Sequence, residues 1–275
     1  MNALKMQRFF EQRKASAEPM VLVTVRETSG STYSKAGDLM LIDQHGVGCG
    51  MLSGGCLESD LAVRAQVVLE SGAPQNVTYE LASDDDDIWG LGIGCDGAMT
   101  IDLQRITSDT DYAPLEIPPA PQVLILGAGP DALPLARLCG ELGWQCTLVD
   151  HRPAYLENRE IPPDCEKHCL EPGQLALKIE LDDFDAAIVM SHHLASDREY
   201  LRHLAQTQIA YVGLLGPAAR RQRLLEDLGE LAPALQERLH GPAGLNLGGR
   251  GPEAIALAIA AQLQCAIAAT SLAGS

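Results

Sequence analysis

One segment constrains the fold of this chain more than any other: "VLILGAGPDALPLARLCGELGWQCTLVD", residues 123–150. Gly127, Gly129 and Ala132 form a G-x-G-x-x-A array between an apolar run and a helical pattern, and Asp150 ends the next apolar run. This order predicts strand, tight turn, helix and strand, as in α/β units that bind dinucleotides. Gly127 would permit the turn, Gly129 would admit a pyrophosphate, and Asp150 would meet a ribose hydroxyl. The alternative is a domain that keeps this fold without binding a dinucleotide.

The pattern downstream of this segment repeats the alternation of apolar strands and helices. It predicts a Rossmann-like, doubly wound parallel sheet over residues 121–275. The preceding residues mix short strands with helices and predict a small mixed α/β domain over residues 1–107. Residues 108–120 are rich in proline and polar side chains, which predicts a linker between the two domains.

Composition narrows the class of protein. The net charge of −17 disfavours binding to nucleic acid or to anionic membranes. No secretory signal is evident at the start, and the eight cysteines are scattered, so we expect a reduced, cytoplasmic protein. We also expect no apolar run of the roughly 18 residues that a spanning helix needs, and no membrane role.

Polar residues follow the later predicted strands. His192 and His193 come directly after "AAIVM", where we expect one to face the ligand edge of the sheet and the other to pack or cap. Arg220, Arg221 and Arg223 follow a further strand and could bind a phosphate or form a solvated helix face. The glycine-rich loop before the last helix is either a packing corner or a lip of the site.

Two thiols in the first domain lie in glycine-rich loops. Cys56 follows Gly54 and Gly55 at the expected start of a helix, where unpaired N–H groups and the helix dipole favour a thiolate. Such a cysteine is a candidate nucleophile or soft-metal ligand. Cys95 occupies a similar loop, and the two thiols could meet at one site. Their spacing excludes the usual zinc ribbon.

Other residues carry weaker signals. The hydroxyl-rich loop "GSTYSKAGD" could bind an anion or be an ordinary turn. Cys165 and Cys169 flank a histidine, and we interpret them as part of a surface segment rather than a metal cluster. Cys139, Cys146 and Cys265 fall on apolar patterns and are expected in the core.

Seven segments together resemble the XdhC/CoxI family, accessory proteins of xanthine dehydrogenase and related molybdenum hydroxylases. In order along the chain they are "GSTYSKAGDLML", "GMLSGGCLE", "GIGCDG", "LILGAGPDA", "VDHRP", "YVGLLGP" and "GPAGLNLGGRGPEAIALAIAAQL". The resemblance extends from about residue 20 to residue 268. It departs from the family pattern at Pro130, Asp96 and Pro217, where histidine, glycine and serine are common.

The resemblance implies a chaperone that binds molybdenum cofactor, supports its sulfuration by a cysteine desulfurase, and delivers it to the apo-enzyme of a molybdenum hydroxylase. It is therefore more a cofactor-binding maturation factor than a catalyst. The expected cofactor-binding residues are Gly54, Gly55, Cys56, Glu58, Cys95, Gly127, Gly129, Asp150, His192 and Arg220, with Cys56 as the candidate metal ligand.

Two alternatives accompany this prediction. In both, a nucleotide or NAD(P) could occupy the second domain. One is an NAD(P)-dependent oxidoreductase with His192 or His193 as its acid, and the other is a nucleotide-sensing regulatory module. The two glycine-loop thiols favour the chaperone, because a dehydrogenase has no need of them. The apolar last helix could serve a homodimer as well as the sheet.

Overall fold

The computed structural model describes the chain except for residues 1, 82–96, 111–114, 116–118, 158–159 and 274–275. The chain forms two compact units, residues 1–119 and 120–275. Each unit has its own sheet and its own buried cores.

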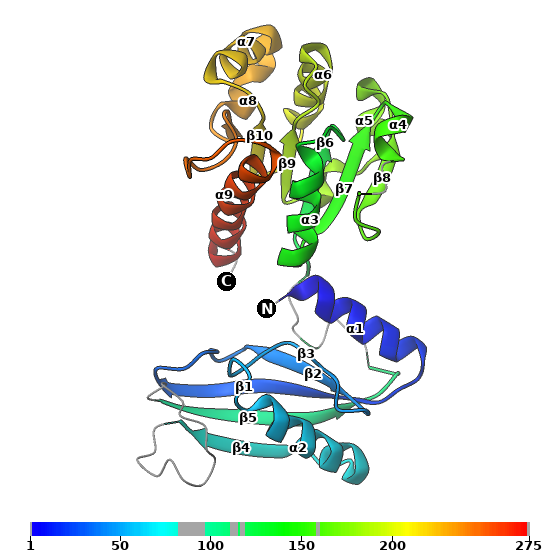
Figure 1. Cartoon of the computed structure of the whole chain (residues 1–275), viewed down its shortest axis with the longest axis vertical. Helices are drawn as coiled ribbons and strands as arrows, with labels where there is room; N and C mark the ends of the chain where they lie inside the picture. Colours follow the sequence, from blue (N-terminus) through cyan, green and yellow to red (C-terminus); the bar gives the residue numbers. More distant parts are fainter. Residues whose placement is uncertain (1, 82–96, 111–114, 116–118, 158–159, 274–275) are drawn as a thin grey trace. The chain divides into compact units, whose positions relative to one another are not determined.

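In its described residues, the first unit is a five-stranded antiparallel sheet, in the order β3-β2-β1-β5-β4, with one helix on each face (Figure 1). Helix α1 covers one face through Met6 and Phe10, and α2 covers the other through Leu61 and Val68. Strand β2 is buried along its whole length because both of its faces are covered. The elements are α1 (Ala3–Ala15), β1 (Met20–Gly30), β2 (Leu39–Asp43), β3 (Gly48–Cys49), α2 (Glu58–Ser71), β4 (Gln75–Glu80) and β5 (Gly97–Ile106).

Over the part of the chain that the structure describes, the second unit is a six-stranded parallel sheet in the order β11-β10-β9-β6-β7-β8. Its strands are β6 (Gln122–Leu126), β7 (Gln145–Asp150), β8 (Glu166–Cys169), β9 (Ala186–Val189), β10 (Tyr211–Leu214) and β11 (Leu239–His240). Its helices are α3 (Ala132–Leu142), α4 (Pro153–Leu156), α5 (Leu175–Lys178), α6 (Leu194–Leu204), α7 (Ala218–Leu228), α8 (Ala232–Gln236) and α9 (Pro252–Ala273).

Strand β6 shows why this sheet needs helices on both sides. Val123 and Ile125 pack with α3 and α9, whereas Leu124 and Leu126 pack with the cluster under α6 and α7. An unbroken apolar run is therefore buried on both faces, as expected for a central parallel strand. The predicted doubly wound sheet is confirmed.

Two short strands, β8 and β11, were not predicted. Residues 166–169 read "EKHC", which has no apolar periodicity, yet they form β8 at the edge of the sheet. The interpretation of Cys165 and Cys169 as a surface segment is wrong for Cys165, which is buried against β7, while Cys169 is exposed. The expectation that Cys265 lies in the core is also wrong, because its side of α9 is exposed.

Helix α9 corrects the expectation about apolar runs. Residues Pro252–Ala269 have a mean hydropathy of 1.4. By length and composition alone, this segment of α9 could cross a membrane. One side of the helix, through Ala256, Ile259 and Leu263, packs into the core beside α3. A helix packed in a protein core can have the same length and hydropathy, so these two properties are weak evidence for a membrane span.

Candidate functional site

The order of the strands in the second unit places a candidate site at its carboxyl edge. From β6 the chain runs through β7 to β8 on one side, and from β9 through β10 to β11 on the other. Parallel sheets of this kind bind ligands outside the carboxyl ends of the strands where the order reverses. Here that point lies between β6 and β9, so the loops after these strands are the first candidates for ligand contact.

The two glycines of the loop after β6 have different surroundings. Gly127 has a φ of +117°, and a Cβ there would lie 2.6 Å from the carbonyl oxygen of Met190 and from the backbone of Ser191. The fold itself therefore requires glycine at 127. A Cβ on Gly129 would meet only the His192 ring, at 3.5 Å. No backbone atom blocks this position, so a ligand approaching Gly129 would have to displace only the His192 side chain.

The carboxylate of Asp150 is buried and is occupied by its own loop. One oxygen accepts hydrogen bonds from the N–H of Ala128 and from Nη2 of Arg152, both at 2.8 Å; the other accepts from the N–H and Nε of Arg152, both at 2.9 Å. Burial opposes the charge of Asp150, but these bonds lower the pKa of its carboxyl. Asp150 thus braces the glycine loop, and a ribose would have to compete for it.

The adjacent histidines divide their roles as predicted. His193 caps α6, and its Nδ1 accepts from the N–H of Ser196 at 3.4 Å. His192 has a φ of +61°, a strained conformation for a residue other than glycine, and its side chain is half exposed. Its Nε2 lies 2.7 Å from a carboxylate oxygen of Asp131, at the start of α3. His192 therefore stands over the Gly129 loop, at the edge where a ligand would bind.

The arginines after β10 also differ from one another. Arg220 donates to the buried carboxylate of Asp197 from Nε at 3.1 Å and from Nη2 at 2.5 Å. Ser191, after β9, donates to the same carboxylate. Arg221 instead donates to the carbonyl oxygens of Leu239 and Gln236, so it holds the end of the sheet together. Of the two, only Arg220 is joined to the loop that carries His192.

The first unit holds Cys56 in a tight glycine turn, which we call the thiol loop (residues 50–57). Gly50, Gly54 and Gly55 all have positive φ values, of +107°, +76° and +112°. Cys56 is half-buried and carries no disulfide. Helix α2 begins two residues later at Glu58 with Leu57 as its N-cap. The prediction that the thiol lies at a helix start is confirmed.

Ser53 and Glu58 close the thiol loop, and we call this pair the Ser53–Glu58 lock. Oε1 of Glu58 accepts from the N–H groups of Leu52 and Ser53, both at 2.9 Å, and Oε2 accepts from Oγ of Ser53 at 2.5 Å. The N–H of Leu57 donates back to Oγ of Ser53 at 2.7 Å. Glu58 is one of the residues expected from the sequence to bind the cofactor, whereas Ser53 is not among them. In the structure the Glu58 carboxylate orders the loop that presents Cys56.

Substitution of Glu58 by glutamine should loosen this loop. Burial opposes the charge, but the bonds from Ser53 and Leu52 lower the pKa of Glu58 below its ordinary 4.5. The ionised Glu58 therefore contributes its full stabilisation of the fold above about pH 4.5. This stabilisation is lost as the pH falls through the lower pKa that Glu58 has in the folded protein. We expect Glu58→Gln to lower the free energy of unfolding by about 1 kcal/mol at pH 7. The variant should also lack the loss of stability that protonation of Glu58 causes at low pH.

Urea unfolding at pH 7 and pH 4 measures the Glu58 effect. Glu70→Gln is the matched control, since Glu70 is exposed on the same helix. Equal behaviour of the two variants at both pH values would show that the lock does not order the loop.

The hydroxyl-rich loop after β1 is an internally bonded turn. Thr32 and Ser34 are buried, and Oγ1 of Thr32 donates to the carbonyl oxygen of Ser34 at 2.7 Å. This favours the ordinary-turn interpretation over an anion-binding loop. Between them Tyr33 is 61% exposed, and its ring lies 3.6 Å from where a Cβ on Gly54 would be. Tyr33 therefore borders the thiol loop, although no signal in the sequence pattern singled it out.

Cys95, the second predicted thiol, lies outside the described residues. Its predicted meeting with Cys56 therefore stays a prediction. Among the residues that the structure describes, no group of three or more His, Cys, Asp or Glu side chains is placed to hold a metal ion.

Comparisons with known proteins cover almost the whole chain. Residues 123–263 match the family model described as the XdhC Rossmann domain, and residues 14–80 match the model of the XdhC and CoxI family. The chain is 29% identical to a Bacillus subtilis protein described as a probable component of xanthine dehydrogenase, over 90% of this chain and 92% of that protein. It is 24% identical to the molybdenum cofactor insertion chaperone PaoD of Escherichia coli, over 93% and 86% of the two chains.

A solved structure is similar over nearly the full length. A crystal structure described as that of a xanthine dehydrogenase from Bacillus halodurans matches with a TM-score of 0.82 at 27% identity. The match covers 98% of this chain and 96% of that one. The family resemblance and the predicted fold class are both confirmed.

Proposed function

This chain belongs to the XdhC family, and from that premise we propose that it is an accessory protein that binds molybdenum cofactor and inserts it into a molybdenum hydroxylase of the xanthine dehydrogenase type. Two relatives support the proposal through what they are called, a probable component of xanthine dehydrogenase and a molybdenum cofactor insertion chaperone. The cofactor is the cargo of such a protein.

The observation that carries the proposal is the geometry of the thiol loop. Three glycines with positive φ and the Ser53–Glu58 lock hold Cys56 on a turn, in front of a helix that begins at Glu58. A thiolate favours soft partners such as molybdenum or sulfur. A half-buried thiol on a fixed turn suits temporary retention of a cofactor, because one soft contact can be made and later released.

The second unit has its own candidate position for a phosphate-bearing ligand, at the Gly129 loop. No backbone atom crowds Gly129, which only the half-exposed His192 ring approaches, and the N-terminus of α3 follows; both support this assignment. A nucleotide or NAD(P) could use the same position. The oxidoreductase alternative has less support, because both carboxylate oxygens of Asp150 are already hydrogen bonded to Arg152. A dehydrogenase of this fold needs that carboxylate for the ribose of its cofactor.

The finer steps follow from the same proposal. A cysteine desulfurase would supply sulfur to the cofactor while it is held, and the apo-hydroxylase would then receive it. Both encounters would take place in the cytoplasm. A homodimer would form through the side of α9 that the sheet leaves uncovered, where Leu257 is 55% exposed.

Expression in a host that makes molybdenum cofactor tests the proposed function. The purified chain should retain close to one molybdenum and one pterin per chain, measured by elemental analysis and by fluorescence of the oxidised pterin. The same chain from a host that cannot make the cofactor should contain neither. Equal molybdenum content from the two hosts would overturn the proposal.

A further inference from the structure

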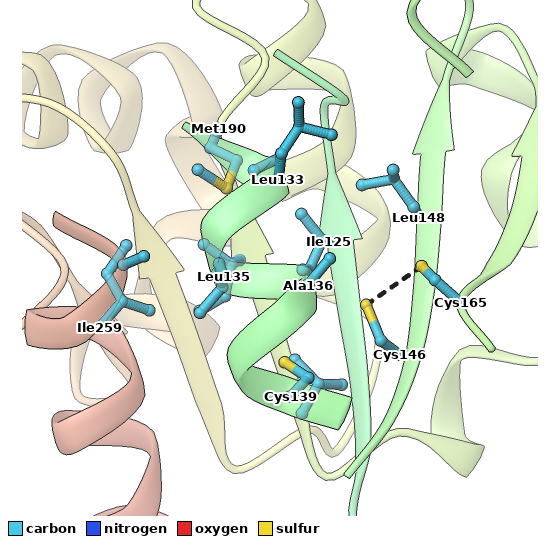
Figure 2. Close-up of a cluster of buried hydrophobic side chains, with 14 of the residues drawn as sticks. Ile125, Leu133, Leu135, Ala136, Cys139, Cys146, Leu148, Cys165, Met190 and Ile259 are labelled. Carbon is cyan, nitrogen blue, oxygen red and sulfur yellow. Dashed lines mark hydrogen bonds between the residues drawn. The ribbon is translucent and has the colours of Figure 1, made fainter. Parts of the chain in front are cut away.

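Two cysteines of the second unit lie side by side, Cys146 in β7 and Cys165 directly before β8. Strands β7 and β8 are parallel with Thr147 opposite Glu166, so Cys146 and Cys165 occupy the position just before that pair. Their Sγ atoms are 3.4 Å apart (Figure 2). Cys146 and Cys165 are only 4% and 5% exposed, and both belong to the hydrophobic core that α3 covers. Neither thiol has a place in the proposed cofactor chemistry.

We propose that Cys146 and Cys165 are a redox-modifiable pair that forms a reversible disulfide, joining the edge strand β8 to β7. Neighbouring strands lie about 4.8 Å apart, which is within the Cα separations that disulfides span. The two sulfur atoms must approach by roughly 1.4 Å to reach bonding distance. Rotation of the two side chains can supply a shift of this size without moving the strands.

The electrostatics of the pair assign the roles in the reaction. The contact with Cys146 lowers the pKa of Cys165, and Lys167 adds to this effect. Contacts with Cys139 and with Cys165 raise the pKa of Cys146. Of the two thiols, Cys165 is therefore the more readily ionised, and we take it as the one that reacts first.

The oxidant we assign is hydrogen peroxide, which is small enough to reach a nearly buried thiol. The Cys165 thiolate attacks one peroxide oxygen, the O–O bond breaks, and the departing hydroxide takes a proton to become water, leaving a sulfenic acid. The sulfur of Cys146 then attacks the sulfur of Cys165, loses its proton, and expels the oxygen as a second water. Two thiols give up two electrons, and one peroxide becomes two waters.

The third thiol of this core provides a matched control. Cys139, on α3, is buried, and its thiol interacts with that of Cys146. It lies on a helix, away from the β7–β8 pairing whose first pair directly follows Cys146 and Cys165. Removal of the Cys139 thiol should therefore leave the reacting pair in place.

Peptide mapping of the full-length chain tests the proposal. The folded protein is treated with hydrogen peroxide, its remaining thiols are blocked in denaturant, and it is cleaved after glutamate without reduction. Cleavage after Glu141, Glu157, Glu160 and Glu166 places the three cysteines on separate peptides. We expect a linked pair of peptides, 142–157 with 161–166, which dithiothreitol separates. The disulfide should raise the melting temperature of the second unit by roughly 5 °C.

Variants identify the partner. Cys139→Ala should retain the linked peptides, whereas Cys165→Ala should lose both the link and the rise in melting temperature. The mapping of the unchanged chain does not depend on whether either variant folds. Linkage of Cys139 to Cys146 would overturn the assignment. So would conversion of Cys165 to a sulfinic acid without a link, or unreacted Cys146 and Cys165 after the exposed Cys169 and Cys265 have been oxidised.

Discussion

Replacement of Cys56 by alanine should lower the affinity for molybdenum cofactor by about 10- to 100-fold, with little change in stability. Loss of a metal ligand or of its close support typically costs this much. The side chain is half-buried and forms no disulfide, so its removal should leave the fold intact. Cofactor retained per chain after purification, followed by titration with released cofactor, gives the measurement.

The control for Cys56 is Cys265→Ala. Cys265 is an exposed thiol on α9 and should have no effect on binding. If Cys56→Ala and Cys265→Ala bound the cofactor equally well, Cys56 would not be a contact. If both variants bound the cofactor poorly, the loss of affinity would not be specific to Cys56, and the thiol loop would not be the binding site.

Replacement of Gly127 by alanine should destabilise the second unit by about 3 kcal/mol. The added Cβ would meet the backbone of Met190 and Ser191 at 2.6 Å, and the residue would be forced to keep a φ of +117°. For a unit of this size the melting temperature should fall by roughly 6 to 12 °C. Differential scanning calorimetry measures the change directly.

Gly129→Ala is the matched variant two residues away. Its Cβ would make only ordinary contact with the His192 ring at 3.5 Å, so the melting temperature should change by no more than about 2 °C. If a phosphate approaches this loop, the variant should still weaken binding of the ligand. Two results would contradict this division of roles. One is a Gly127→Ala variant as stable as the unchanged protein, and the other is a Gly129→Ala variant as unstable as Gly127→Ala.

The parts of the structure that the sequence predicts well are local. The apolar run of β6, the turn at Gly127 and the helix that follows are adjacent in the chain, and each obeys its own periodicity or backbone requirement. The position of Cys56 near the start of α2 is predicted for the same reason. No long-range contact is needed to recognise either feature.

The parts that the sequence does not reveal depend on partners that the pattern cannot identify. Strand β8 has too few apolar residues to show a period, and it exists because β7 supplies its hydrogen bonds. The burial of Cys165 follows from that pairing. The hydrogen bond from Arg152 to Asp150 depends on the direction in which the arginine side chain points, which the sequence pattern does not show. A serine five residues before a glutamate at a helix start was the one available signal for the Ser53–Glu58 lock.

Co-expression with a molybdenum hydroxylase tests the central claim most directly. The hydroxylase is produced alone, with this chain, and with its Cys56→Ala variant, and the molybdenum content and activity of each purified hydroxylase sample are measured. We predict that the unchanged chain raises both values severalfold and that the variant leaves them close to those of the hydroxylase alone. Equal molybdenum content and activity with and without this chain would contradict the account.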